Sequence, residues 1–208
     1  MLHDVDTDST AELLPDLFCW TKYGTEAGED IGAILERKES ERLASGGTFL
    51  WGVGNAIGPS VEALLAHAVE PQVVFTPMRS RPAARDVAPA QVAVWHRGVG
   101  LDGEPFELQD SWRVTSRISP SKRHHYALVC RSQQPLGVSG RPLQSFASTH
   151  VQNLRSGSKV GASQVTSVVR RIACALGLIP SSYTVTFTAD LVAPYFVRLT
   201  EHSLIDAS

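Results

Sequence analysis

The chain has 208 residues, of which 43% are hydrophobic and 19% are charged. This length and composition favour one globular domain with a sizeable core and exclude an intrinsically disordered chain. No apolar run reaches the roughly eighteen residues that a membrane span needs, and the acidic start lacks the basic stretch of a signal peptide. We therefore expect a cytoplasmic protein with no membrane partner.

The formal net charge of -2 hides an uneven distribution of charge along the chain. Residues 1–30 hold eight acidic side chains against Lys22 alone, whereas residues 79–171 hold fourteen Lys or Arg against five acidic residues, a net charge of +9. Fifteen of the nineteen basic residues are Arg, whose planar guanidinium suits phosphates and base edges. A GC-rich coding sequence would produce the same excess of Arg, so both explanations stay open.

The first 130 residues predict short strands and two helices. Residues 1–14 are acidic and aperiodic, which indicates a loose arm, and we expect residues 15–208 to form a single domain. Apolar runs predict strands at 17–22, 48–51, 72–76, 91–95 and 126–130, with weaker extended stretches at 106–108 and 112–118. A helix is expected over 26–44, with Ile31, Ile34, Leu35 and Leu43 on its apolar face, and a shorter one from Pro59 to Ala68.

The remainder of the chain predicts a third helix and two further strands. Gly161–Ser163 is expected to open a helix with an apolar stripe that ends at Gly177, and strands follow at 183–188 and 195–199. The stripe consists of Val165, Val168, Val169, Ile172 and Leu176. Strands outnumber helices and do not alternate with them, so we expect an α+β fold in which about three helices pack around a curved mixed or antiparallel sheet.

The usual signatures of catalysis and metal binding are missing. We find no phosphate-binding loop, dinucleotide fingerprint, zinc-protease motif, nucleophile elbow or zinc-deaminase pair, and therefore predict no catalytic residue, metal or cofactor. Neighbouring His124 and His125 on a strand would point to opposite faces, which disfavours a shared metal. The segment 157–163 could cradle a phosphate at the start of the third helix, and helix capping by Ser163 explains it equally well.

Three of the four tryptophans fall at the ends of predicted strands, next to polar or glycine-rich loops. Trp20 precedes Lys22, Trp51 precedes a glycine-rich loop that ends at Asn55, and Trp95 precedes Arg97. Converging indole rings with Arg nearby would make a pocket of the size of a base, because rings stack on bases. Burial in an ordinary core is the competing explanation of the same pattern.

Four segments resemble a known family. The strand Phe18–Lys22, followed by a helix and by Phe49–Asn55, is similar to the start of EVE-domain proteins of the PUA-like superfamily. The segments 73–80 and 92–97 resemble later strands of that family, so the resemblance covers about residues 17–130 and leaves a divergent C-terminal part. It implies a PUA-like pseudobarrel and a non-catalytic reader of a modified, flipped base in DNA or RNA.

The resemblance also implies roles for particular residues. Trp51 and Trp95 would stack on the base, Asn55 would contact a base edge, and cations would hold phosphates. The predicted base-binding residues are Trp20, Lys22, Trp51, Gly52, Val53, Asn55, Met78, Ser80 and Trp95. The predicted phosphate-binding residues are Arg79, Arg81, Arg97, Arg113, Arg117, Lys122 and Arg123.

The expected partner is a nucleic acid with a modified base, and a separate nuclease is a further candidate. Two alternatives stay open: an enzyme that acts on a modified nucleotide or another small molecule, and a protein-interaction module. A pocket residue with a strongly shifted pKa would favour the enzyme. A large exposed apolar patch would favour the interaction module.

Overall fold

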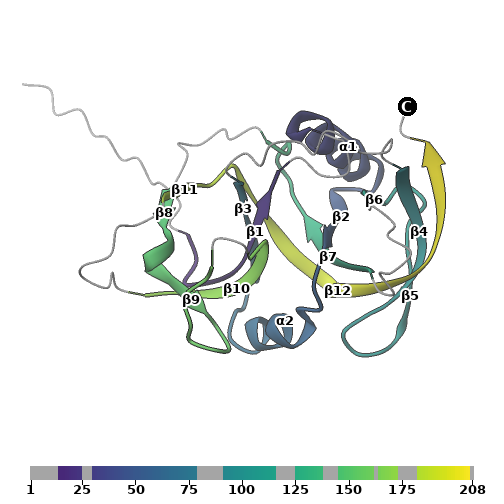
Figure 1. Cartoon of the computed structure of the whole chain (residues 1–208). Coiled ribbons are helices and arrows are strands. Elements are labelled where there is room, and N and C mark those ends of the chain that lie inside the picture. Colours follow the sequence, from purple (N-terminus) through teal and green to yellow (C-terminus); the bar gives the residue numbers. More distant parts are fainter. Residues whose placement is uncertain are drawn as a thin grey trace, which may run out of the picture.

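Strands make up most of the structure (Figure 1), a computed structural model that describes residues 14–24, 30–78, 91–115, 125–137, 145–161, 164–172 and 182–206. Its helices are α1 (Ile31–Ala44), α2 (Gly58–Leu65) and one 3-10 turn (Ser148–His150). Its strands are β1 (Leu17–Tyr23), β2 (Thr48–Val53), β3 (Gln72–Pro77), β4 (Gln91–Val99), β5 (Pro105–Glu107), β6 (Arg113–Thr115), β7 (His125–Arg131), β8 (Ser145–Ala147), β9 (Val151–Asn153), β10 (Thr166–Arg171), β11 (Ser182–Thr184) and β12 (Phe187–Asp206).

Ten of the described strands form one mixed sheet. Its order is β2-β7-β12-β3-β1-β10-β9, and β4 pairs with β12 while carrying β5 and β6 on its other edge. The β1–β3 pair is parallel and the other pairs are antiparallel, and β8 and β11 make a separate two-stranded sheet. The predicted α+β class and mixed sheet are confirmed. The described strands do not close into a barrel.

The long strand β12 joins the two halves of the sheet that Figure 1 shows side by side. It pairs in turn with β3, β7 and β4, and its register shifts between Leu191 and Phe196. Such an irregularity bends a strand. Further along, Gly98 of β4 lies so close to β12 that an added Cβ would stand 2.1 Å from a methyl carbon of Val197. Only glycine allows the two strands this approach.

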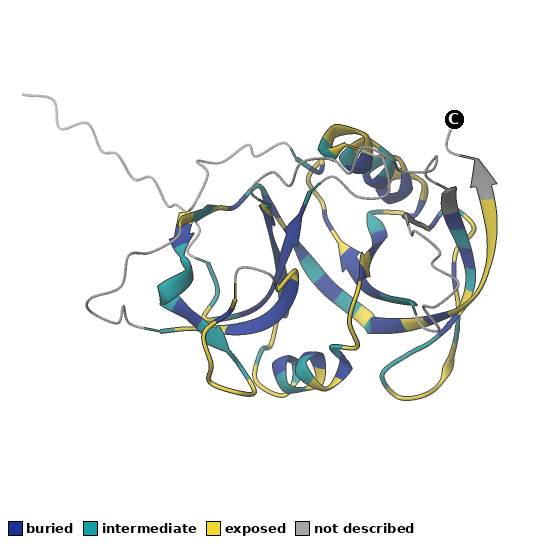
Figure 2. Cartoon of the chain, in the orientation of Figure 1, coloured by how far each residue is buried: buried dark blue, intermediate teal, exposed yellow. Residues whose placement is uncertain are grey.

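Buried side chains form three hydrophobic clusters, and strand alternation separates them. Figure 2 shows buried residues along the strands of both halves of the sheet and on both helices. On β1, Cys19 and Tyr23 belong to a central cluster beneath α1 and α2, whereas Phe18 and Trp20 point to the other face and pack with β8 and β11. A third cluster lies between β4, β7 and β12. Successive residues of a strand face opposite sides, so one strand supplies two cores.

Helix α1 begins at Ile31, with Asp30 as its N-cap, and buries a polar rather than a purely apolar face. Lys38 and Glu41 form a buried ion pair, which also holds the Arg113 carbonyl and the Leu50 amide. Leu43 is largely exposed, so its predicted place on the buried face is wrong. Leu43 follows the buried Ile34 by nine residues, which is about two and a half turns, so the two side chains project from opposite sides of the helix.

The predicted third helix is wrong over its described part. Residues 166–171 form strand β10, which pairs with β1 and β9. Val168 packs into the central cluster and Val169 into the cluster around Trp20, so both faces of the strand are apolar. A short strand buried on both sides produces the same apolar run as a helical stripe. Leu176 and Gly177 lie outside the described residues.

The described chain thus holds two α-helices where about three were expected. Neither helix has the length and apolar character that crossing a bilayer requires. The predicted strand over 183–188 is divided between β11 and the start of β12. The remaining predicted strands are present, most of them one to four residues longer than expected.

Candidate functional site

The three tryptophans expected to share a pocket lie in three different core clusters. Trp20 is 1% exposed, Trp51 is 7% exposed and Trp95 is 2% exposed, and each packs with a separate set of neighbours. A base cannot contact all three rings at one place. The predicted three-ring pocket is therefore wrong, because the strands that carry the rings direct them into separate parts of the core.

The glycine-rich loop after β2 does not bring Trp51 and Asn55 to one surface. Trp51 packs edge-on against Phe75, with ring centroids 4.8 Å apart, and Val53 beside it is also buried. Gly52 and Asn55 are exposed. Trp51 therefore contributes to the core while Asn55 faces solvent, and the pair makes no shared recognition surface in this structure.

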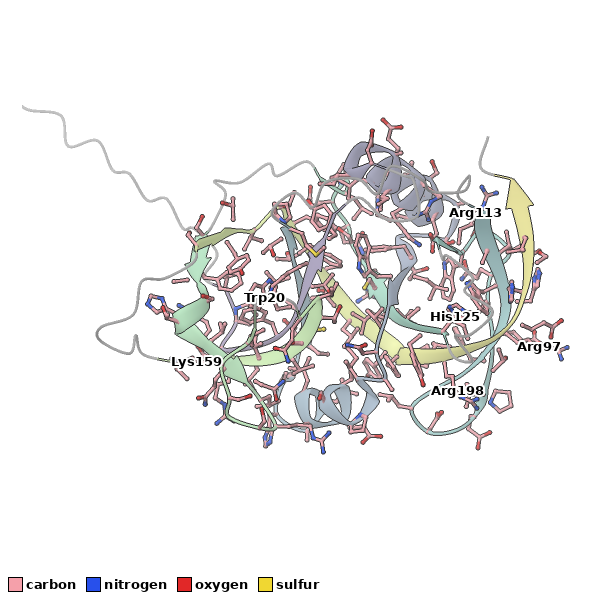
Figure 3. The ribbon with its side chains drawn as sticks, in the orientation of Figure 1. Trp20, Arg97, Arg113, His125, Lys159 and Arg198 are labelled. Atoms are coloured by element: carbon pink, nitrogen blue, oxygen red, sulfur yellow. The ribbon has the colours of Figure 1, made fainter. Side chains whose placement is uncertain are left out.

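The structure does bring Trp20 and Lys22 together (Figure 3 labels Trp20). These residues project from the same face of β1, and the indole N–H of Trp20 donates a 2.9 Å hydrogen bond to the Thr76 hydroxyl on β3. The Lys22 ammonium lies 4.3 Å from the Trp20 ring centroid and 5.2 Å from that of Tyr183. It also donates to the Gly161 carbonyl at 3.1 Å. We call these five residues the Lys22 cluster.

Within the Lys22 cluster, Tyr183 is the ring that reaches the surface. Trp20 and Lys22 are buried, whereas Tyr183 is only half-buried and stands edge-on to Trp20 with ring centroids 4.7 Å apart. Burial lowers the pKa of Lys22, because removing an ammonium from water disfavours its charged form. The two rings and the carbonyl partly offset that cost through cation-π attraction and hydrogen bonding.

The Lys22 cluster lies where the parallel strands β1 and β3 both end. Lys22 is in register with Thr76, and Tyr23 with Pro77. Directly after this last pair, the amide of Met78 donates a 2.6 Å hydrogen bond to the Tyr23 carbonyl. The half-buried Met78 therefore lies at the same edge of the sheet as Lys22. Ser80, also assigned to that site, lies outside the described residues.

A group of five basic residues, which we call the basic rim, lies around β9, at the end of β10 and in the turn after β9; Arg170 and Arg171 are beside the start of β1, at the end opposite Lys22. It consists of His150, Arg155, Lys159, Arg170 and Arg171, and its Lys and Arg members are exposed. No Asp or Glu occurs in the sequence between Asp110 and Asp190, so the segments that form this part of the structure carry no carboxylate side chain. Exposed Asp16 precedes β1, and its backbone carbonyl accepts a hydrogen bond from the Arg171 amide, which makes it an acidic neighbour of the rim.

The rim is held in place by an ordered turn and connects directly to the Lys22 cluster. The Asn153 side chain accepts hydrogen bonds from the amides of Arg155 and Ser156, which fixes the tip of the turn after β9. Lys159 forms a backbone bridge to Gln152, and Gly161, two residues later, is the acceptor for Lys22. Figure 3 shows Lys159 on the same side of the molecule as Trp20.

The Arg and Lys residues that the sequence predicted as phosphate ligands are not part of the basic rim. Arg97 and Arg113 lie on the opposite half of the sheet, where Arg97 is 3.7 Å from Glu201 (Figure 3). That half also carries four acidic side chains in the described range 101–110, so its surface charge is mixed. The other predicted phosphate ligands, Arg79, Arg81, Arg117, Lys122 and Arg123, lie outside the described residues. Only two of the seven predicted phosphate ligands are described, so the predicted basic face stays a prediction.

Sequence reasoning missed Tyr183 and the basic rim. The signal that could have found the rim is the complete absence of acidic residues from 111 to 189, a stretch that holds ten Lys or Arg. The segment 157–163 attracted attention as a phosphate cradle at the start of a helix. Because the strand β10 follows this segment, the described residues place no helix N-terminus there to hold a phosphate. Gly161 nevertheless belongs to the Lys22 cluster.

The described residues offer no cluster of three or more His, Cys, Asp or Glu suited to a metal ion. Cys19 and Cys130 are buried and unpaired, and burial raises the pKa of both thiols, that of Cys19 to about 12. Comparison with protein-family models, with curated proteins and with solved structures gave no match to this chain. Function therefore has to be argued from the site itself.

Proposed function

We propose that this protein is a non-catalytic nucleic-acid-binding protein whose contact surface is the basic rim. The observation that supports this most strongly is the acid-free stretch between Asp110 and Asp190, which supplies the rim's five basic side chains. Lys and Arg contacts to phosphates supply most of the affinity of such proteins, and carboxylates within the surface would oppose it. The half of the sheet that carries Arg97 has a mixed charge and suits a polyanion less well.

We further propose that the Lys22 cluster contacts a base. Tyr183 offers the half-exposed ring on which a base can stack, and Trp20 and Lys22 support that ring from the core side. This replaces Trp51 and Trp95, which are buried in other clusters, as the stacking residues. The resemblance to EVE-domain proteins supports a modified base as the target, held out of the stack at the cost of unpairing.

The salt dependence of oligonucleotide binding tests the first part of the proposal. On duplex DNA the slope of log affinity against log salt is about -0.9 for each phosphate contact, and about -0.7 on single strands. The double variant Arg155→Gln/Lys159→Gln should bind more weakly and reduce the slope by up to about 1.8 on duplex DNA. Both side chains are exposed, so the fold should tolerate the change.

A matched control lies on the other half of the sheet. Arg97→Gln/Arg198→Gln also removes two exposed cations, and we expect it to leave the affinity and the slope close to those of the unaltered protein (Figure 3). An affinity that is independent of salt would exclude nucleic acid as the partner. Equal losses in both double variants would show that the rim is not the contact surface.

A further inference from the structure

The fourth tryptophan, Trp112, forms an unusual pair with Trp95. The β4–β6 ladder ends with Val94 in register with Arg113, and Trp95 and Trp112 are the residues that directly adjoin this last pair. Trp95 is 2% exposed and Trp112 is 3% exposed, and both belong to the cluster between β4, β7 and β12.

Both indole N–H groups of this pair are shielded from solvent, and neither has a hydrogen-bond acceptor within the part of the chain that the structure describes. Buried polar atoms without a partner are rare in folded proteins, and two on neighbouring side chains point to a common acceptor. Trp20 provides the contrast, because its buried N–H is satisfied by Thr76. The rest of the cluster cannot supply an acceptor from its side chains, which are aliphatic or aromatic hydrocarbon.

We propose that Trp95 and Trp112 form a binding site for a small, mostly apolar molecule that carries a carbonyl oxygen, as a ketone or a carboxylate. One oxygen accepts from the two indole N–H groups, and the hydrocarbon part contacts the apolar neighbours Leu50, Leu108 and Phe106. His125 and His202 flank Trp95, with ring centroids 5.1 Å and 4.5 Å from it. Figure 3 shows His125 on the half of the sheet away from Trp20, so this site is separate from the nucleic-acid surface.

Nuclear magnetic resonance of the indole N–H groups tests the proposal directly. The chain has four tryptophans and hence four indole signals, which single Trp→Phe variants assign. We would titrate the full chain with hexanoate and with 2-hexanone, and use hexane as the probe without an acceptor. The expected result is a saturable downfield shift of the Trp95 and Trp112 protons with at least one carbonyl probe, while the Trp20 proton does not move.

Two outcomes would overturn the proposal. One is the absence of a saturable shift with either carbonyl probe, together with magnetisation transfer from water to both protons, which would show that water alone fills the site. The other is an equal response to hexane, which would show that the acceptor is irrelevant. Because no nucleic acid is present, failure here would leave the proposed function untouched.

A conservative variant separates the hydrogen bond from packing. Trp112→Phe keeps an aromatic ring and removes one donor, and we expect it to weaken binding of the active probe about tenfold, as loss of one hydrogen bond does. Trp51→Phe, in another cluster, should bind as the unaltered protein does. An unchanged affinity in Trp112→Phe would contradict the shared acceptor. If Trp112→Phe fails to fold, Trp95→Phe serves the same purpose, and the titration of the unaltered chain still decides.

Discussion

The buried ion pair of α1 gives a sharp test of how this fold is stabilised. The Lys38 ammonium lies 2.6 Å from a Glu41 carboxylate oxygen, and both side chains are almost fully buried. Lys38 also donates to the Arg113 carbonyl of β6, and Glu41 accepts from the Leu50 amide of β2 at 2.7 Å. The pair therefore ties the helix to two strands, one of which begins directly after Trp112.

Replacing one partner should cost much more than replacing both. Lys38→Met leaves the Glu41 carboxylate buried with only the neutral backbone donors of Leu50 and Arg113, and removal of one member of a buried pair costs about 3–5 kcal/mol. In Lys38→Met/Glu41→Gln no charge remains, and the new amide oxygen can still accept from Leu50. We therefore expect the double variant to lose at least about 2 kcal/mol less than the sum of the two single variants.

Urea unfolding followed by circular dichroism measures these free energies, and its pH dependence adds a second test. Burial lowers the pKa of Lys38 from 10.5 to about 8. Between these values the unfolded chain binds more protons at this group, so its contribution to stability rises from about pH 8 to 10.5. Lys38→Met should lack that rise. Additive costs in the double variant, or an identical pH profile in Lys38→Met, would refute the interpretation of the pair.

Three further predictions follow from the packing and from the proposed contact surface. Gly98→Ala should cost about 1–3 kcal/mol and lower the melting temperature, because its Cβ would clash with Val197, whereas Gly54→Ala, with open space around it, should change little. Equal melting temperatures would contradict the close approach of β4 and β12. Tyr183→Ala should weaken oligonucleotide binding by about 1–3 kcal/mol and Tyr183→Phe should retain it, and equal binding by both would exclude stacking. Removal of residues 2–12, which carry four acidic side chains and lead to Leu14 beside Arg171, should raise the affinity for oligonucleotides in a filter-binding assay, and an unchanged affinity would show that they do not compete for the rim.

The sequence predicts strands well where turn residues bound a short apolar run. The β-branched and aromatic runs at 17–22 and 72–76 identify β1 and β3, because their ends are marked by turn residues. Prediction fails at β10, where Val168 and Val169 are buried on opposite faces and imitate a helical stripe. It also fails at Leu43, because the buried face of α1 is polar and an ion pair replaces apolar contacts.

The candidate site was predicted only in part. Lys22 and Met78 share a sheet edge because β1 and β3 are parallel and in register, a long-range pairing that local patterns do not reveal. Trp20, Trp51 and Trp95 were predicted at strand ends, but they lie inside β1, β2 and β4, which extend beyond the predicted bounds. The core that each ring enters depends on which face of the assembled sheet its strand turns toward that core. Tyr183 was missed because it lies about 160 residues along the sequence from Trp20 and Lys22, and only the fold brings its strand next to them.

Photo-crosslinking would show whether nucleic acid binds on the basic rim with a base at Tyr183. An oligonucleotide that contains 5-bromouracil would be irradiated with the full chain, and the crosslinked peptides would be identified by mass spectrometry. We expect crosslinks within residues 145–172 and at Tyr183, and we expect them to disappear at high salt as the phosphate contacts weaken. Crosslinks confined to β4, β5 and β12, around Arg97 and Arg198, would contradict this proposal.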